Sequence, residues 1–152
     1  MSAEITTNRK ALRDFHILER FEAGIELTGT EIKSIRAGLV SLQGSFARVD
    51  GRNLCLYDAS IQPYIRASHE QHEPKRPRRL LLHRVEIDKL VGEVERSGRT
   101  IVALRLYWKN HIVKVELGLG KGKDSGDKRA DLKKRVESRE IDRAIADFQR
   151  KR

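Results

Sequence analysis

The chain has 152 residues, of which 38% are hydrophobic and 36% charged, with a formal net charge of +10 and a pI near 10.0. Such a length fits one small domain with an appendage, and so high a pI favours a nucleic-acid partner over a merely solvated basic surface. A single cysteine and the absence of a long apolar run or leader segment argue against a disulfide-stabilised secreted domain and a membrane span, so we expect a cytoplasmic protein.

The first strand and the first helix are predicted from short local patterns. Phe15–Phe21 has the composition of a strand, which Ala23-Gly24 interrupts and Ile25–Leu27 resumes. Thr28 and Glu31 then have the spacing of a capping box, in which each side chain bonds the backbone amide of the other residue. A short helix should therefore begin at this point.

The end of that helix and the hairpin after it are also predicted. Ile32 and Ile35 lie on one helical face, and Gly38 is placed to end the helix. Strand-like runs at 45–49 and 53–57 flank Asp50-Gly51, a dipeptide that favours a β-hairpin turn.

The second half of the chain predicts a longer helix and a second hairpin. A polar stretch over 66–79 precedes a helical pattern with Val85, Leu90 and Val94 as apolar positions and Gly98 as its end. Two alternating runs then predict a hairpin with one buried face, ending near residue 117. These runs are Val102, Leu104, Leu106 and Trp108, then Val113, Val115 and Leu117.

Together these elements predict a mainly β fold over residues 1–120. About six short strands with two or three short helices must close their edges, and a small barrel of the oligonucleotide-binding type does so. A split sandwich fits the same pattern. Residues 121–152 are predicted to be a separate basic tail, and the glycines at 118, 120 and 122 suggest a flexible hinge before it.

The tail has 12 Lys and Arg against 7 Asp and Glu. Its apolar surface is too small to offset the entropy of ordering the backbone, so we expect it to be disordered alone. A broken apolar stripe favours a helix that forms on docking to an anionic partner, and chance placement is the alternative. The stripe consists of Leu132, Val136, Ile141, Ile145 and Phe148.

Three basic patches are candidates for phosphate contact, with little base specificity and a steep salt dependence. The N-terminal patch could instead be frayed, and the second patch could be a solvated loop. The third patch is the tail. Their residues are Asn8, Arg9, Lys10 and Arg13; Lys75, Arg76, Arg78 and Arg79; and Lys121, Lys123, Lys128, Arg129, Lys133, Lys134 and Arg135.

Signals for an enzyme are poor. The histidines of His69-Glu70-Gln71-His72 are one residue too close for the zincin motif, and the glycines of 118–123 lack the spacing of a phosphate-binding loop. Cys55 between two leucines is expected to be a small buried hydrophobe. A small nuclease with a disordered tail stays the enzymatic alternative, against which the lack of a metal-ligand cluster counts.

Several motifs, taken in order, resemble one family. They are Asn8–Ala11, Phe21–Ile25, Gly29–Gly38, Arg76–His83, Leu106–Asn110, Gly120–Lys123 and Asp127–Arg129. Their order and spacing hold from about residue 8 into the tail. The set resembles small protein B (SmpB), the SsrA-binding proteins that bind transfer-messenger RNA in bacterial trans-translation. A generic basic RNA-binding barrel would explain the charge but not this ordered set of motifs.

The resemblance implies a barrel that holds the tRNA-like domain of transfer-messenger RNA near its elbow. Alanyl-charged RNA, this protein and elongation factor Tu with GTP would enter a stalled ribosome together. The tail would lie in the empty message channel and form a helix there, and the unfinished peptide would be tagged for proteolysis. We expect a monomer that needs no cofactor or metal and performs no bond chemistry.

The resemblance also implies site residues. On the RNA side these are Asn8, Lys10, Glu22, Arg76, Arg78 and Leu81, with Arg13 where many members have His. On the ribosome side they are Lys121, Lys123, Asp127, Lys128 and Arg129, with the tail cations Lys133, Lys134 and Arg135. A carboxylate repels phosphate, so Glu22 should accept from a base amine or a 2′-hydroxyl, or orient a neighbouring cation. Leu81 either packs on RNA or, as we favour, supports the loop from the core.

Overall fold

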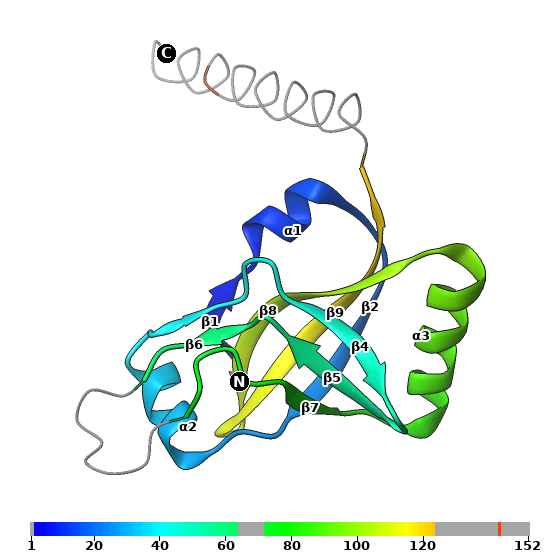
Figure 1. Ribbon diagram of the computed structural model, residues 1–152. Helices are drawn as coiled ribbons and strands as arrows, with labels where there is room; N and C mark the ends of the chain where they lie inside the picture. Colours follow the sequence, from blue (N-terminus) through cyan, green and yellow to red (C-terminus); the bar gives the residue numbers. More distant parts are fainter. Residues whose placement is uncertain (1, 64–71, 124–142, 144–152) are drawn as a thin grey trace. The chain divides into compact units, whose positions relative to one another are not determined.

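Six strands close a ring in the structure, a computed structural model that describes residues 2–63, 72–123 and 143 (Figure 1). The order around the ring is β8-β4-β5-β7-β2-β9, and β9 pairs again with β8. The strands are β2 (Phe15–Ile25), β4 (Phe46–Asp50), β5 (Asn53–Tyr57), β7 (Arg78–Leu81), β8 (Thr100–Lys109) and β9 (Ile112–Gly122). This closed barrel confirms the mainly β prediction and excludes the split sandwich.

Three further strands lie outside the ring. β1 (Ser2–Thr7) pairs with β8, while β3 (Val40–Ser41) and β6 (Ser60–Ile61) form a small sheet of their own. β1 was not predicted from the sequence. The ring and these strands all belong to one compact unit, residues 1–122.

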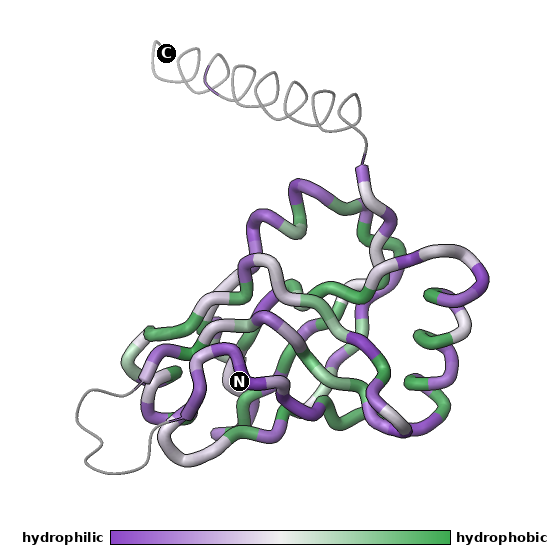
Figure 2. Tube along the Cα trace, in the orientation of Figure 1, coloured by the Kyte–Doolittle hydropathy of each residue, from purple (hydrophilic) through white to green (hydrophobic). Residues whose placement is uncertain are grey.

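The interior of the barrel is filled by aliphatic side chains from every strand of the ring. Leu54, Leu80, Val115 and Leu117 are all at most 2% exposed. Figure 2 shows hydrophobic residues where the strands cross and on the side of α3 that faces the barrel. Burial of this apolar surface is the main favourable contribution to folding.

Three helices accompany the barrel: α1 (Arg9–Asp14), α2 (Gly29–Arg36) and α3 (Arg84–Ser97). The predicted capping box is confirmed, because Thr28 and Glu31 bond each other's backbone amides at the start of α2. Gly98 ends α3 in the left-handed conformation, with a φ of 61°, as predicted. Val85 is 80% exposed, however, so its assignment to the apolar face of α3 was wrong; Ile87 occupies that face.

The prediction of one buried face for β8 is wrong. Ile101 and Ala103 belong to the main core, whereas Val102 and Leu104 belong to a second cluster beneath α1. A bulge between Ala103 and Arg105 shifts the register against β9, and the apolar residues after it return to the main core. Bulges of this kind let a strand bend around a small barrel.

β2 also differs from its prediction, since it runs without interruption. Ala23 is buried in the main core, and Gly24 pairs with Lys114 on one side and with Leu81 on the other. The glycine therefore marks a place where two strands flank the backbone closely, and not a break.

β9 continues to Gly122, so the predicted hinge at 118–122 is wrong. A Cβ atom on Gly118 would lie 2.9 Å from Leu104 Cδ1, and one on Gly120 would lie 3.2 Å from Phe15 Cβ. These glycines are needed for close packing under β2 and β8 and not for flexibility.

Cys55 was predicted to be buried, but it is half-buried on β5 while its neighbours Leu54 and Leu56 fill the barrel. Desolvation, followed by the charge of Asp50, raises the pKa of its thiol. The alternation of the strand sends every second side chain outward, and Cys55 is one of these.

Candidate nucleic-acid interface

Glu22 stands near the far end of β2, on the rim of a cavity of about 540 Å³. Strands β2, β5, β7 and β9 and the start of α3 supply its lining, which includes Gly24, Leu81, His83 and Lys114. The cavity therefore combines a carboxylate, an imidazole, an amine and an aliphatic side chain. This mixture can hydrogen-bond to bases and sugars as well as contact phosphate.

Two neighbours on β8 hold the Glu22 carboxylate. The Tyr107 hydroxyl donates to Oε2, and Lys109 Nζ lies 3.0 Å from Oε1. The bonds from Tyr107 and Lys109 lower the pKa of Glu22, so the group is a carboxylate near neutral pH. Its side chain is still 41% exposed, which leaves lone pairs for an outside donor.

Leu81 lies in the same cavity as Glu22 and points outward. It is 45% exposed, so the favoured interpretation, that it supports the loop from the core, is wrong. Gly24 on β2 makes room for it, since a Cβ atom there would lie 3.2 Å from Leu81 Cβ. An exposed leucine beside a carboxylate offers an apolar surface to a base or ribose.

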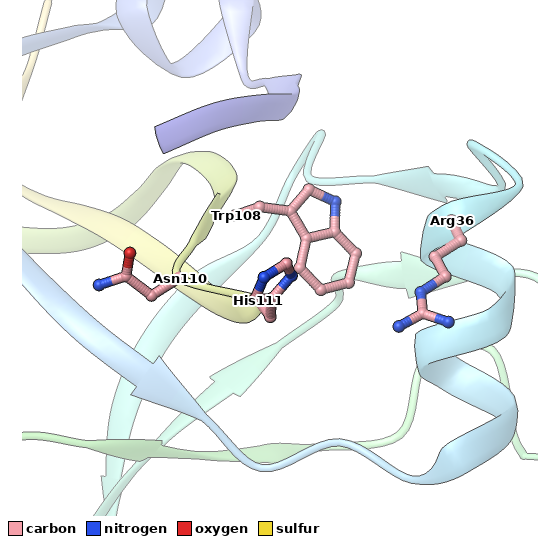
Figure 3. Close-up of a pocket in the computed structure, with 4 residues that line it drawn as sticks. All are labelled: Arg36, Trp108, Asn110 and His111. Atoms are coloured by element: carbon pink, nitrogen blue, oxygen red, sulfur yellow. The ribbon is translucent and has the colours of Figure 1, made fainter. Parts of the chain in front are cut away.

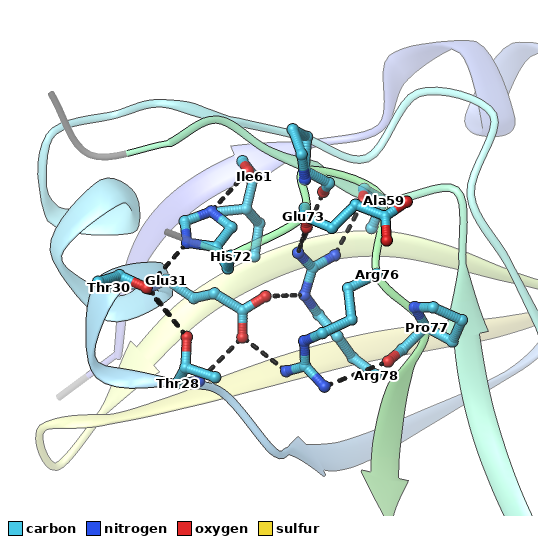
Figure 4. A network of polar contacts seen from close by, with 11 residues as sticks. Thr28, Thr30, Glu31, Ala59, Ile61, His72, Glu73, Arg76, Pro77 and Arg78 are labelled. Carbon is cyan, nitrogen blue, oxygen red and sulfur yellow. Dashed lines mark hydrogen bonds and ion pairs between the residues drawn. The ribbon is translucent and has the colours of Figure 1, made fainter. Parts of the chain in front are cut away.

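A second group of residues surrounds Glu31 on α2 (Figure 4). Glu31 Oε2 accepts from Arg78 Nε at 2.5 Å, and Oε1 accepts from Arg76 at 2.7 Å and from the Thr28 amide at 2.8 Å. Burial alone would raise the pKa of Glu31, but these donors outweigh it and the pKa is lowered. The Glu31 carboxylate thus links the N-terminal cap of α2 to the start of β7.

Arg78 is a structural residue in this network. Its side chain is fully buried and also donates to the Ala59 and Pro74 carbonyls. The expectation of a basic side chain on an open loop, ready for phosphate, is wrong for Arg78. Arg76 keeps 36% of its side chain exposed and lies at the surface of the same network.

His72 completes the Glu31 group from the loop side. Its two ring nitrogens bond the Thr30 hydroxyl at 2.9 Å and the Ile61 carbonyl at 2.7 Å. The ring is buried and both of its nitrogens are hydrogen-bonded, so His72 has a structural role. The described residues, 2–63, 72–123 and 143, contain no cluster of three acidic, histidine or cysteine side chains that could hold a metal ion.

Asn8 organises the third group, at the start of α1. Its Oδ1 accepts from the Ala11 amide at 3.1 Å, and its Nδ2 donates to the carbonyls of Leu42 and Ala103. Asn8 is therefore buried, and its side chain positions the helix. Lys10 is exposed and Arg13 has 52% of its side chain exposed, so these cations point to solvent.

The structure does not bring all these residues together. Lys10 and Arg13 precede β2, while Glu22 lies near its end, about 25 Å away at the rise of an extended strand. Glu22 and Leu81 share one cavity, and Arg76 and Arg78 lie around Glu31. A partner that contacts all three groups must be long, as a folded nucleic acid is.

The predicted tail residues lie almost entirely outside the described part of the chain. Lys121 is described, but it belongs to β9 and not to a tail. It pairs there with His16 on β2. Lys123 follows that strand. The expected tail contacts at Asp127, Lys128, Arg129, Lys133, Lys134 and Arg135 lie outside the described residues.

Sequence reasoning missed Tyr107, Lys109 and Lys114 as members of the Glu22 group. The motif Leu106–Asn110 contains Tyr107 and Lys109, but only the pairing of β2 with β9 and of β9 with β8 brings these residues to Glu22. In these pairings Glu22 lies opposite Glu116, and Tyr107 lies opposite Lys114. Knowledge of this strand register would have indicated the three residues. Among the described residues, no helix is long and apolar enough to cross a membrane.

The sequence profile described as "SmpB protein" matches residues 5–147. The chain belongs to the SmpB family. This member is 51% identical to the SsrA-binding protein of Carboxydothermus hydrogenoformans, over 95% of this chain and 97% of the relative. It is 52% identical to the SsrA-binding protein of Corynebacterium glutamicum, over 93% of this chain and 86% of the relative.

A solved structure supports the fold of this SmpB family member. The structure described as "tmRNA-SmpB: a journey to the center of the bacterial ribosome" superimposes with a TM-score of 0.69 at 43% identity. The match covers 86% of this chain and 95% of that chain. The family is one of RNA-binding proteins and not of enzymes, which excludes the nuclease alternative.

Proposed function

We propose that this protein binds the tRNA-like domain of transfer-messenger RNA and delivers it to stalled ribosomes for trans-translation. Membership of the SmpB family over almost the whole chain supports this function. The structure adds an exposed Glu22 carboxylate, oriented by Tyr107 and Lys109 and placed beside an outward Leu81. That cluster is the observation that carries the proposal, because a carboxylate held ready for donors suits base and sugar recognition.

The basic side chains have a separate role in this proposal. Lys10, Arg13 and Arg76 contact phosphate and set the position of the RNA on the barrel. Arg78 and Asn8 position other residues. Arg78 binds Glu31, which in turn binds Arg76, and Asn8 caps the start of α1. Contacts at three separated groups fit the extent of a folded tRNA-like domain.

The tail has a second partner in this proposal. Its net positive charge suits the empty message channel of the ribosome, where Lys123, Lys128 and Arg129 contact ribosomal RNA and a helix forms. The protein acts in the cytoplasm as a monomer, and elongation factor Tu with GTP binds the charged RNA and not the barrel.

A matched pair of variants tests the RNA site. Glu22 and Glu19 both lie on β2, each with 41% of its side chain exposed and each paired with a lysine. Glu22→Ala should weaken binding to the tRNA-like domain by about tenfold or more, the range for hydrogen bonds to a charged group. Glu19→Ala should leave the affinity within about twofold. Wild-type affinity for Glu22→Ala, with the fold intact by circular dichroism, would remove Glu22 from the site.

A further inference from the structure

A second cavity, of about 440 Å³, opens at the turn between β8 and β9. Its lining is Arg36, Trp108, Asn110 and His111 (Figure 3). Arg36 comes from the last turn of α2, and the other three come from the hairpin. The fold thus brings a cation from one element to an aromatic ring on another.

The turn itself fixes two of these residues. Asn110 and His111 both have positive φ, 51° and 67°, between the paired residues Lys109 and Ile112. Two such residues form the tight hairpin turn that matches the twist of the strands. His111 adopts this conformation without being glycine, and its ring lines the same cavity as Trp108 (Figure 3).

Arg36 faces the Trp108 ring from across the cavity. Its guanidinium carbon lies 5.7 Å from the ring centroid, and the Arg36 side chain is exposed. Trp108 packs one side against the main core, so its position is fixed while part of the ring stays open. A fixed aromatic plane with a movable guanidinium opposite can admit a flat ring between them.

The chemistry of the cavity selects its ligand. Unpaired nucleobases bind by stacking on aromatic rings and on guanidinium planes, and their edges hydrogen-bond to amides and imidazoles. A phosphate alone would make no stacking contact with Trp108. A purely apolar ligand would form no hydrogen bond with the polar side chains of the lining. A nucleobase uses the ring, the guanidinium and the imidazole, whereas the Asn110 amide points away from Trp108 and Arg36 (Figure 3).

The cavity and the Glu22 group draw on consecutive residues of β8, so Trp108 and Lys109 project from opposite faces of the same strand. Lys109 lies between Trp108 and Asn110 in the sequence, and its amine pairs with the Glu22 carboxylate. A single RNA can therefore contact Glu22 and reach the cavity around the same hairpin. We infer that an unpaired base of the RNA bound at Glu22 stacks on Trp108 with Arg36 on its other side; this inference rests on the proposed function.

Trp108 is the only tryptophan of the chain, so its fluorescence reports on this cavity alone. The full-length protein is titrated with a transcript of the tRNA-like domain, and emission and gel-shift complex formation are followed in the same samples. Stacking should quench the emission in step with complex formation. A complex that forms with unchanged emission overturns the inference and leaves the proposed function standing. If no complex forms, both fail.

Variants separate stacking from a general loss of charge. Arg36→Gln should weaken RNA binding at least fivefold more than Arg96→Gln, which removes an equal charge from the last turn of α3. Trp108→Leu should weaken binding by roughly 5- to 100-fold, and Trp108→Phe, which keeps a ring, should recover most of that loss. Equal effects of Arg36→Gln and Arg96→Gln, or of Trp108→Phe and Trp108→Leu, would contradict stacking.

Discussion

Glu31 places a carboxylate where its side chain has no contact with water. Taking a carboxylate out of water is costly, and only close opposite charges and full hydrogen bonding compensate for it. Here Arg78 is equally buried, and the two groups come from positions 47 residues apart. The pair therefore specifies how α2 docks on β7, and the loss of one partner would leave the other charge uncompensated.

Glu31→Gln tests this role. The substitution keeps the size of the side chain but removes the charge opposite Arg78, so we expect the free energy of unfolding to fall by roughly 3–5 kcal/mol. Urea unfolding at pH 7 measures it. Glu95→Gln, at an exposed position on α3, should change that free energy by less than about 0.5 kcal/mol. Similar midpoints for the two variants would show that the buried pair contributes little.

The same pair predicts a pH dependence. The folded protein lowers the pKa of Glu31, so its stabilising effect is complete above the pKa of an unfolded glutamate, about 4.3, and is lost as the pH falls through the lower folded value. The stability difference between wild type and Glu31→Gln should therefore be constant near neutral pH and shrink below about pH 4. Urea midpoints across this range measure it, and a constant difference at acid pH would show that the charge is not responsible.

Two glycines of β9 differ in how closely their neighbours pack around them. Gly118 lies where a methyl group would meet Leu104, whereas Gly122 on the same strand has open space and an ordinary backbone angle. Gly118→Ala should lower the free energy of unfolding by about 1–3 kcal/mol, the usual cost of overpacking a core. Gly122→Ala should leave it unchanged or slightly raise it, since alanine restricts the unfolded chain. Thermal unfolding of both variants decides this, and equal melting temperatures would refute the close packing.

Element boundaries show what the sequence reveals and what it hides. The capping box at Thr28 and the end of α3 at Gly98 depend on neighbouring residues, so local pattern predicted both correctly. The hairpin after β4 was also predicted, but its turn lies one residue later, at Gly51-Arg52, because Asp50 still pairs with Asn53. The bulge after Ala103 depends on the partner strand, and it reverses which residues of β8 point inward. Pattern alone cannot place such a bulge, because the outward Val102 is as apolar as the inward residues.

The candidate site follows the same rule. The resemblance to a family indicated Glu22 and Leu81, and the structure brings both to one cavity. The resemblance could not reveal that Arg78 is buried, because its partner Glu31 is distant in the sequence and both residues are charged. Composition predicts that charged residues are at the surface, and only the paired fold shows the exception.

We expect the barrel and the tail to have different tasks. Removal of residues 124–152 leaves every strand of the barrel intact, since β9 ends at Gly122. This truncation should keep the affinity for the tRNA-like domain within about threefold and abolish peptide tagging on stalled ribosomes. Binding assays and a tagging assay with purified components measure the two effects. Parallel loss of both activities would contradict the division of tasks.

We expect the barrel to recognise one RNA and not negative charge in general. The most direct test is a competition binding assay at physiological salt, in which labelled tRNA-like domain is challenged with a large excess of ordinary transfer RNA. We predict that the complex survives, because Glu22 and its neighbours read features beyond phosphate. Equal displacement by ordinary transfer RNA would contradict the account and leave a basic barrel that binds RNA without discrimination.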